Sequence, residues 1–138
     1  MKNKGNLKKR LIICAVIAVV WVLFCSWQNN MLTVSEYTYK SDKISEGFTI
    51  VQISDLHNKN YGKKQKRLIE KISALEPDII VITGDIVDSR HTNIPKAIEF
   101  GEEAAKIAET YYVTGNHEHR LSWQEFESLM NGLKQAGV

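Results

Sequence analysis

The chain has 138 residues, of which 43 % are hydrophobic and 25 % charged, and this size and composition suit one globular domain rather than two large ones. Its formal net charge is +2, but five positive charges lie within the first ten residues. The rest of the chain contains 13 basic and 16 acidic side chains. This mildly acidic balance argues against a nucleic-acid-binding surface, which needs Lys and Arg concentrated on a folded face.

The N-terminal region joins a basic tail, residues 1–10, to an uncharged apolar segment, residues 11–27. A helix needs roughly 17–25 apolar residues to cross a bilayer, so this segment predicts a single transmembrane anchor. Because positive charges stay on the cytoplasmic side, we expect a cytoplasmic N-terminus and an extracytoplasmic remainder at the cell membrane. A cleaved signal peptide is the alternative, although residues 24–27 (Phe-Cys-Ser-Trp) lack the small side chains of a cleavage site.

Residues 28–47 are expected to form a linker, within which the β-prone segment 34–40 suits an edge strand. The hydrophobic pattern beyond it predicts strands over 48–54, 78–83 and 111–114 and helices over 68–75, 94–108 and beyond 122. The resulting β-α-β-α-β-α order predicts the α/β fold class over residues 48–138, with a parallel sheet and right-handed crossovers.

The last predicted helix begins with a capping box, in which Ser122 and Glu125 satisfy backbone donors reciprocally. Its apolar residues recur at helical spacing. We therefore expect four side chains to face the core, namely Trp123, Phe126, Met130 and Leu133.

Side chains of metal-ligand type follow each of the three predicted strands. The segments are Ser54-Asp55-Leu56-His57, Gly84-Asp85-Ile86-Val87-Asp88 and Gly115-Asn116-His117-Glu118-His119. Because parallel strands bring their carboxyl ends to one edge of a sheet, we expect these segments to converge. Carboxylate, imidazole and amide groups without a thiolate suit Mn²⁺, Fe or Zn²⁺. The sequence therefore predicts a metal site at this edge.

Each segment taken alone also has a simpler interpretation as a turn or a solvated loop. Their succession at three strand ends is what favours a metal site. A phosphoacceptor receiver domain also collects Asp residues at strand ends, but it does not explain Asn116 and His117. We interpret the basic run over residues 63–67 as a solvated helix start. Arg90 and His91 are interpreted as loop residues, with a role in substrate binding as the alternative.

The segments Asp55-Leu56-His57, Gly84-Asp85-x-x-Asp88 and Gly115-Asn116-His117-Glu118 together resemble the signature of the calcineurin-like metallophosphoesterase family. The N-terminal anchor resembles the membrane-associated bacterial branch of that family. The resemblance implies an α/β/β/α sandwich with two metal ions, of which this chain would form the N-terminal half.

The resemblance also implies roles for individual residues. Asp55 and His57 would bind the first metal ion, Asp85 would bridge both ions, and Asn116 would bind the second. Two residues would be catalytic: His117 would assist the leaving group, and Glu118 would orient His117.

The implied reaction is hydrolysis of a phosphomonoester or phosphodiester by water activated between two metal ions. The family pattern continues with further histidine ligands, whereas this chain has no histidine after His119. We therefore expect a fragment with little activity of its own. The alternative function is a non-catalytic, membrane-anchored remnant that binds metal weakly. A site facing the membrane points to lipid-linked or cell-envelope phosphoesters as substrates, and no nucleic-acid partner is expected.

Overall fold

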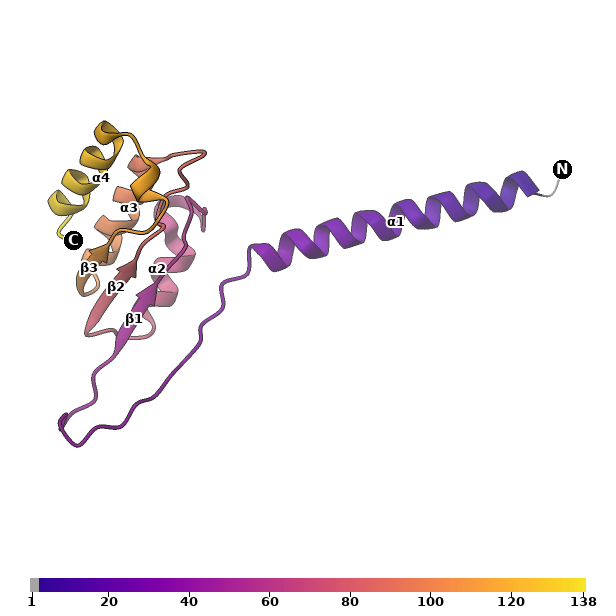
Figure 1. Cartoon of the computed structure of the whole chain (residues 1–138). Coiled ribbons are helices and arrows are strands. Elements are labelled where there is room, and N and C mark those ends of the chain that lie inside the picture. Colours follow the sequence, from indigo (N-terminus) through magenta and orange to yellow (C-terminus); the bar gives the residue numbers. More distant parts are fainter. Residues whose placement is uncertain (1–2) are drawn as a thin grey trace. The chain divides into compact units, whose positions relative to one another are not determined.

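The computed structural model describes residues 3–138 of the chain and divides the chain into two compact units, Met1–Lys40 and Ser41–Val138. The first unit consists of one long helix and a linker, and the second contains the sheet and the remaining helices (Figure 1). The predicted α/β class, with one apolar helix ahead of a parallel sheet, is confirmed.

Helix α1, Asn3–Asn29, extends beyond both ends of the predicted span 11–27. Its first turns include Lys8, Lys9 and Arg10, which are good helix formers and continue the apolar helix without a break. Met1 and Lys2 of the predicted basic tail lie outside the described residues. Within Asn6–Asn29 the mean hydropathy reaches 2.4, so α1 is long and apolar enough to cross a bilayer, a property that a signal sequence shares.

The linker contains no strand, so the edge strand considered for residues 34–40 is wrong. A strand needs a neighbour to satisfy its backbone hydrogen bonds, and no described strand pairs with this segment. Its side chains are accordingly exposed, Tyr37 to 81 % and Tyr39 to 91 %. The chain then turns at Ser41, whose carbonyl accepts the backbone N–H of Ile44 at 3.4 Å.

The sheet has three parallel strands, β1 (Ile50–Ile53), β2 (Ile79–Thr83) and β3 (Glu109–Val113), in the order β1-β2-β3. The register pairs Ile53 with Ile82, and Ile82 with Tyr112. All three strands therefore end at the same edge of the sheet (Figure 1). This arrangement confirms the parallel sheet predicted from the β-α-β-α-β-α order of the elements along the chain.

The helices of the second unit are α2 (Lys66–Ser73), α3 (Ile94–Ala105) and α4 (Trp123–Gln135), with short 3-10 turns η1 (Lys63–Gln65) and η2 (Glu118–Arg120). Helix α3 packs against α4, and Gly101 allows their close approach. A Cβ atom on Gly101 would lie 2.6 Å from Leu133 Cδ2. The predicted capping box of Ser122 and Glu125 is confirmed at the start of α4.

The core lies between the helices and one face of the sheet. It contains alternate strand residues and one stripe from each helix, including Val51, Ile80, Ile82, Leu68, Ile72, Ala97, Phe100, Ala104, Leu129 and Leu133. The expectation that Trp123 faces this core is wrong, because its side chain is 77 % exposed. Successive helical residues are about 100° apart, so Trp123 lies about 120° around α4 from Leu129, which is fully buried.

The opposite face of the sheet is largely apolar and exposed. Ile50, Tyr111 and Val113 on this face are 57 %, 51 % and 60 % exposed. On the same face the Gln52 side chain donates to Thr83 Oγ1 at 2.9 Å. In the described part of the chain no second sheet covers these residues.

We predict that Ser122→Ala destabilises α4, because the Ser122 hydroxyl accepts the backbone N–H of Glu125 at 3.3 Å and completes the capping box. The expected loss is about 0.5–2 kcal/mol. The loss is measured on the full chain in detergent, by hydrogen exchange of α4 peptides across a series of urea concentrations. An unchanged urea midpoint in α4 would show that the capping box does not stabilise this helix, and Ser128→Ala is the matched control within α4.

Candidate metal centre

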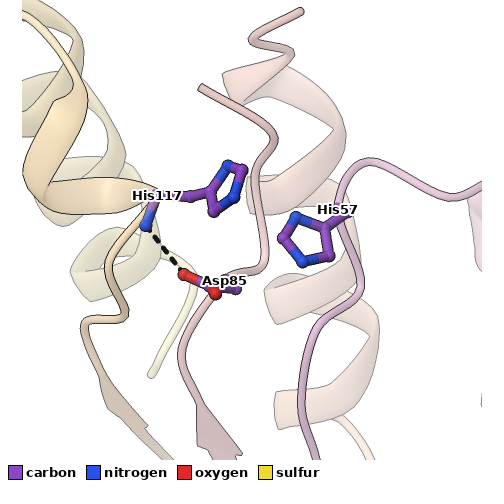
Figure 2. Close-up of side chains that lie close together, drawn as sticks. All are labelled: His57, Asp85 and His117. Atoms are coloured by element: carbon purple, nitrogen blue, oxygen red, sulfur yellow. Dashed lines mark hydrogen bonds between the residues drawn. The ribbon is translucent and has the colours of Figure 1, made fainter. Parts of the chain in front are cut away.

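Three side chains from three different loops meet at the carboxyl edge of the sheet. His57 follows β1, Asp85 follows β2 and His117 follows β3. One ligand atom from each lies within 4.8 Å of the others. Figure 2 shows the two imidazoles next to each other, with ring centroids 4.4 Å apart, and the Asp85 carboxylate below them. These three predicted site residues are therefore brought together, although they are 28 to 60 positions apart in the sequence.

The backbone at this edge is held in unusual conformations. Asp55, His57 and Asp85 have φ values of 55°, 44° and 52°, in the left-handed region that non-glycine residues rarely adopt. Hydrogen bonds between the first two loops maintain them: His57 N–H donates to the Asp85 carbonyl at 2.9 Å and Asn58 N–H to the Ile86 carbonyl at 3.1 Å. Such conformations cluster at functional sites, where the surrounding structure enforces them.

His57 provides a direct test of whether a metal ion suits this site. Its Nδ1 atom is buried and has no hydrogen-bond partner among the described residues, while Nε2 lies 3.5 Å from Asp55 Oδ1. A buried imidazole nitrogen without a partner is unfavourable unless it binds a ligand. Together with the Asp85 carboxylate, this nitrogen belongs to the donor types that Mn²⁺, Fe and Zn²⁺ accept, so the residues fit a metal ion.

Hydrogen bonds from the loop after β2 and from Asp85 fix the position of His117. The backbone N–H of Ser89 donates to His117 Nδ1 at 3.1 Å, and the His117 backbone N–H donates to Asp85 Oδ1 at 2.8 Å (Figure 2). Since a backbone N–H only donates, Nδ1 is the acceptor, and the neutral ring carries its proton on Nε2. The neutral ring thus presents Nε2–H as its hydrogen-bond donor.

Asp88 adds a permanent negative charge next to His117. Arg90 donates its backbone N–H to Asp88 Oδ1 at 2.9 Å, and its guanidinium donates to both carboxylate oxygens at 3.2 and 3.3 Å. The backbone hydrogen bond first, and then the guanidinium, lower the pKa of Asp88 to about 2. Asp88 Oδ1 lies 3.5 Å from His117 Nδ1.

The buried side chain of Glu118 connects two loops of the site. Its side chain is completely buried and accepts backbone N–H groups from Gly115 at 2.7 Å, Asp85 at 2.9 Å and Val87 at 3.3 Å. The carboxylate therefore joins the loop after β2 to the loop after β3. Because no part of it is exposed, Glu118 does not contact a substrate directly. These contacts hold the Asp85 backbone in place, and the expected role of Glu118 in orienting His117 stays a prediction.

Gly115 makes this loop junction possible. A Cβ atom on Gly115 would lie 2.6 Å from the Asp85 backbone nitrogen, closer than real Cβ atoms approach. Glycine is therefore required where the two loops meet, as its place ahead of a ligand residue suggested.

The other expected site residues are not members of this three-residue cluster. Asp55 is exposed and reaches the cluster through its 3.5 Å contact with His57, and Asn116 is exposed within the loop after β3. His119 lies to one side, where its ring stacks on Phe126 with centroids 6.5 Å apart.

Ser89 and Asn58 were not identified from the sequence. Ser89 supplies the N–H that fixes His117, and the Asn58 side chain donates to the His91 carbonyl at 2.7 Å. In the sequence Ser89 follows Asp88 and Asn58 follows His57, and these neighbours were the only signal available. Both residues act through contacts with residues about thirty positions away.

A family model for the calcineurin-like phosphoesterase matches residues 48–137, which include all three loops. The chain belongs to the calcineurin-like phosphoesterase family. The resemblance noted in the sequence is thereby confirmed, and the family is one of metal-dependent hydrolases.

Several curated relatives are similar to this family member. A transmembrane protein with metallophosphoesterase domain from Danio rerio is 30 % identical over 112 residues, covering 79 % of this chain and 25 % of that protein. The uncharacterized metallophosphoesterase YkuE from Bacillus subtilis is 35 % identical over 101 residues, covering 65 % and 34 %. The UDP-2,3-diacylglucosamine pyrophosphatase LpxG from Chlamydia trachomatis is 34 % identical over 92 residues, covering 63 % and 28 %.

The chain spans between a quarter and just under half of the length of the curated relatives that it matches. No solved structure matches it significantly. The relatives that are named transmembrane proteins agree with the apolar helix α1 in indicating a membrane protein.

We predict that Glu118→Gln loosens the junction between the loops after β2 and β3. A neutral amide offers one acceptor oxygen in place of two, and hydrogen bonds to a charged group contribute roughly 1.5–3 kcal/mol each. The expected result is faster hydrogen exchange at Asp85 and Gly115 in the full chain in detergent. Glu127→Gln, on the exposed side of α4, is the control and should leave both amides unchanged. Equal protection of these amides in Glu118→Gln would contradict the positioning role.

Proposed function

We propose that this chain contributes its three strand-end loops to a metal-dependent phosphoester hydrolase. The observation that carries the proposal is the convergence of His57, Asp85 and His117 at the carboxyl edge of the sheet, with ligand atoms within 4.8 Å of one another. Membership of the phosphoesterase family supports the reaction class.

The residues divide into metal ligands and a proton donor. Asp55, His57 and Asp85 would hold one ion, and Asp85 and Asn116 would hold a second, as the family resemblance implies. Bound ions of this kind supply a metal-activated water and neutralise charge on the phosphate. Mn²⁺, Fe or Zn²⁺ suits the carboxylate, imidazole and amide donors.

His117 is proposed to protonate the leaving oxygen. A ring that gives up a proton carries protons on both nitrogens. In that form Nε2 would donate to the leaving oxygen, and Nδ1–H would face Asp88 Oδ1, 3.5 Å away, in place of accepting the Ser89 N–H. General acid catalysis of this type contributes typically about 10²–10⁴-fold.

We further propose a lipid-linked or cell-envelope phosphoester as the substrate class. The support is the apolar helix α1 and the similarity to LpxG, which is named as a UDP-2,3-diacylglucosamine pyrophosphatase. A soluble phosphoester remains the alternative substrate.

We predict metal-dependent hydrolysis that requires Asp85. The assay measures release of p-nitrophenol from bis-p-nitrophenyl phosphate with added Mn²⁺. It compares the 138-residue chain, expected to give little turnover, with a form extended through the further histidine segment of the family. Asp85→Asn should reduce the extended form to background, and Asp78→Asn, whose carboxylate accepts the Thr49 backbone N–H at 2.6 Å far from the centre, is the control.

Two results would change this account. Comparable, Asp85-dependent rates from the short chain would show that the three loops suffice and that the further histidines are unnecessary. An extended form that binds Mn²⁺ without hydrolysing either a diester or a monoester would favour the non-catalytic alternative.

We predict a cytoplasmic N-terminus and an extracytoplasmic second unit, because the positive charges at residues 8–10 precede the apolar segment. Protease added to intact cells should then digest the second unit and leave the N-terminal tail intact. Digestion of the tail with protection of the second unit would invert the orientation. Recovery of a shortened chain, cleaved near residues 24–27, would identify α1 as a signal peptide.

A further inference from the structure

A groove separate from the candidate metal centre lies between the loop after β1 and the beginning of α3. It is an open surface depression of about 420 Å³, lined by Asn60, Gly62, Lys63, Lys64, Asn93, Pro95, Lys96 and Glu99. None of these residues belongs to the metal centre, and pockets of a few hundred Å³ are of a size that accepts small ligands.

The groove carries an excess of positive charge. Three lysines line it against one glutamate. Lys64 pairs with Glu103 at 3.0 Å, whereas Lys63 and Lys96 have no ion-pair partner within residues 3–138. Lys63 and Lys96 come from segments 33 positions apart, so the fold brings to one groove two lysines that form no ion pair within the described residues.

The backbone that presents these lysines is firmly held. Gln65 is 1 % exposed; its side chain accepts the Tyr61 backbone N–H and donates to the Lys59 carbonyl, both at 2.8 Å. Lys64 and Gln65 have φ values of 54° and 53°, a conformation that this internal bonding maintains. The groove is therefore formed in advance, which lowers the entropic cost of binding a ligand.

The second wall is tied to the first. The Asn58 side chain donates to the His91 carbonyl at 2.7 Å, and Asn93 caps α3 by accepting the Lys96 backbone N–H at 3.2 Å. The sequence suggested that residues 63–67 are a solvated helix start. Such a helix start would not need to be fixed against a second segment, as this one is fixed against residues 91–96. The combination of lysine ammonium groups and asparagine amides is one that binds phosphate oxygens.

We propose that this groove binds a phosphate-bearing anion through Lys63 and Lys96. The ligand is either a free phosphorylated small molecule or the headgroup of an anionic lipid, since both present the same phosphate chemistry. The proposal concerns binding alone and does not depend on hydrolysis at the metal centre.

Lysine acetylation with site-resolved mass spectrometry tests the proposal on the full chain, freed of metal with EDTA. One arm adds inorganic phosphate or glycerol phosphate to the chain in dodecyl maltoside. The other compares nanodiscs of phosphatidylcholine with nanodiscs that also contain phosphatidylglycerol. The readout is the acetylation rate of Lys63, Lys64 and Lys96 relative to Lys134, an exposed lysine on α4.

We expect concentration-dependent slowing at the three groove lysines and none at Lys134. Slowing by soluble phosphates identifies a free ligand, and slowing only in phosphatidylglycerol nanodiscs identifies a lipid headgroup. In Lys63→Gln/Lys96→Gln the protection of Lys64 should be lost, whereas Lys134→Gln should preserve it. Equal slowing at Lys134, no slowing in either arm, or protection of Lys64 that survives the double substitution would overturn the proposal. Because EDTA removes any bound metal, failure here leaves the hydrolase proposal intact.

Discussion

The buried carboxylate of Glu118 is the interaction on which the candidate metal centre depends. It satisfies the backbone N–H groups of Asp85, Val87 and Gly115, which would otherwise be buried without acceptors. Leaving such groups unpaired costs roughly 1–3 kcal/mol each, so the loops after β2 and β3 have a strong reason to stay together. The Tyr112 side chain lies beside this carboxylate, and its pKa is raised first by burial and then by the Glu118 charge.

This junction explains how an apolar sheet supports a polar site. The strands place the loops at one edge, but their side chains converge only because the loops hold left-handed conformations at Asp55, His57 and Asp85. Cross-loop hydrogen bonds and the close contact at Gly115 enforce those conformations. The result is a preorganised cluster in which the His57 imidazole and the Asp85 carboxylate suit a divalent metal ion, with the His117 ring next to them.

The parts of the fold that were predictable from the sequence are those set by local periodicity. Ile79–Thr83 is a nearly continuous apolar run and became the central strand, and the Ser122–Glu125 pair became a capping box. Trp123 was expected in the core because it lies at helical spacing from Phe126 and Met130. Spacing alone does not show that the buried side of this helix is centred on Leu129 and Leu133, which leaves Trp123 exposed. The edge strand at 34–40 failed because β propensity does not supply a partner strand.

The candidate site was predictable to a similar depth. The meeting of His57, Asp85 and His117 was predictable, because each residue follows a strand and parallel strands end at the same edge of the sheet. The roles of Glu118 and Ser89 did not follow, since each depends on which backbone N–H group lies opposite across a gap of about thirty residues. The left-handed backbone at Asp55 and His57 also gave no sequence signal, because neither position is a glycine.

The central claim is that these loops form a metal centre, and X-ray absorption of the chain loaded with Zn²⁺ tests it most directly. The account predicts nitrogen and oxygen ligands at about 2.0–2.2 Å with imidazole scattering. That imidazole signal should weaken in His57→Ala and stay unchanged in His119→Ala, whose ring packs against Phe126. An imidazole signal indifferent to His57→Ala, or lost in His119→Ala, would contradict the placement of the centre at this edge of the sheet.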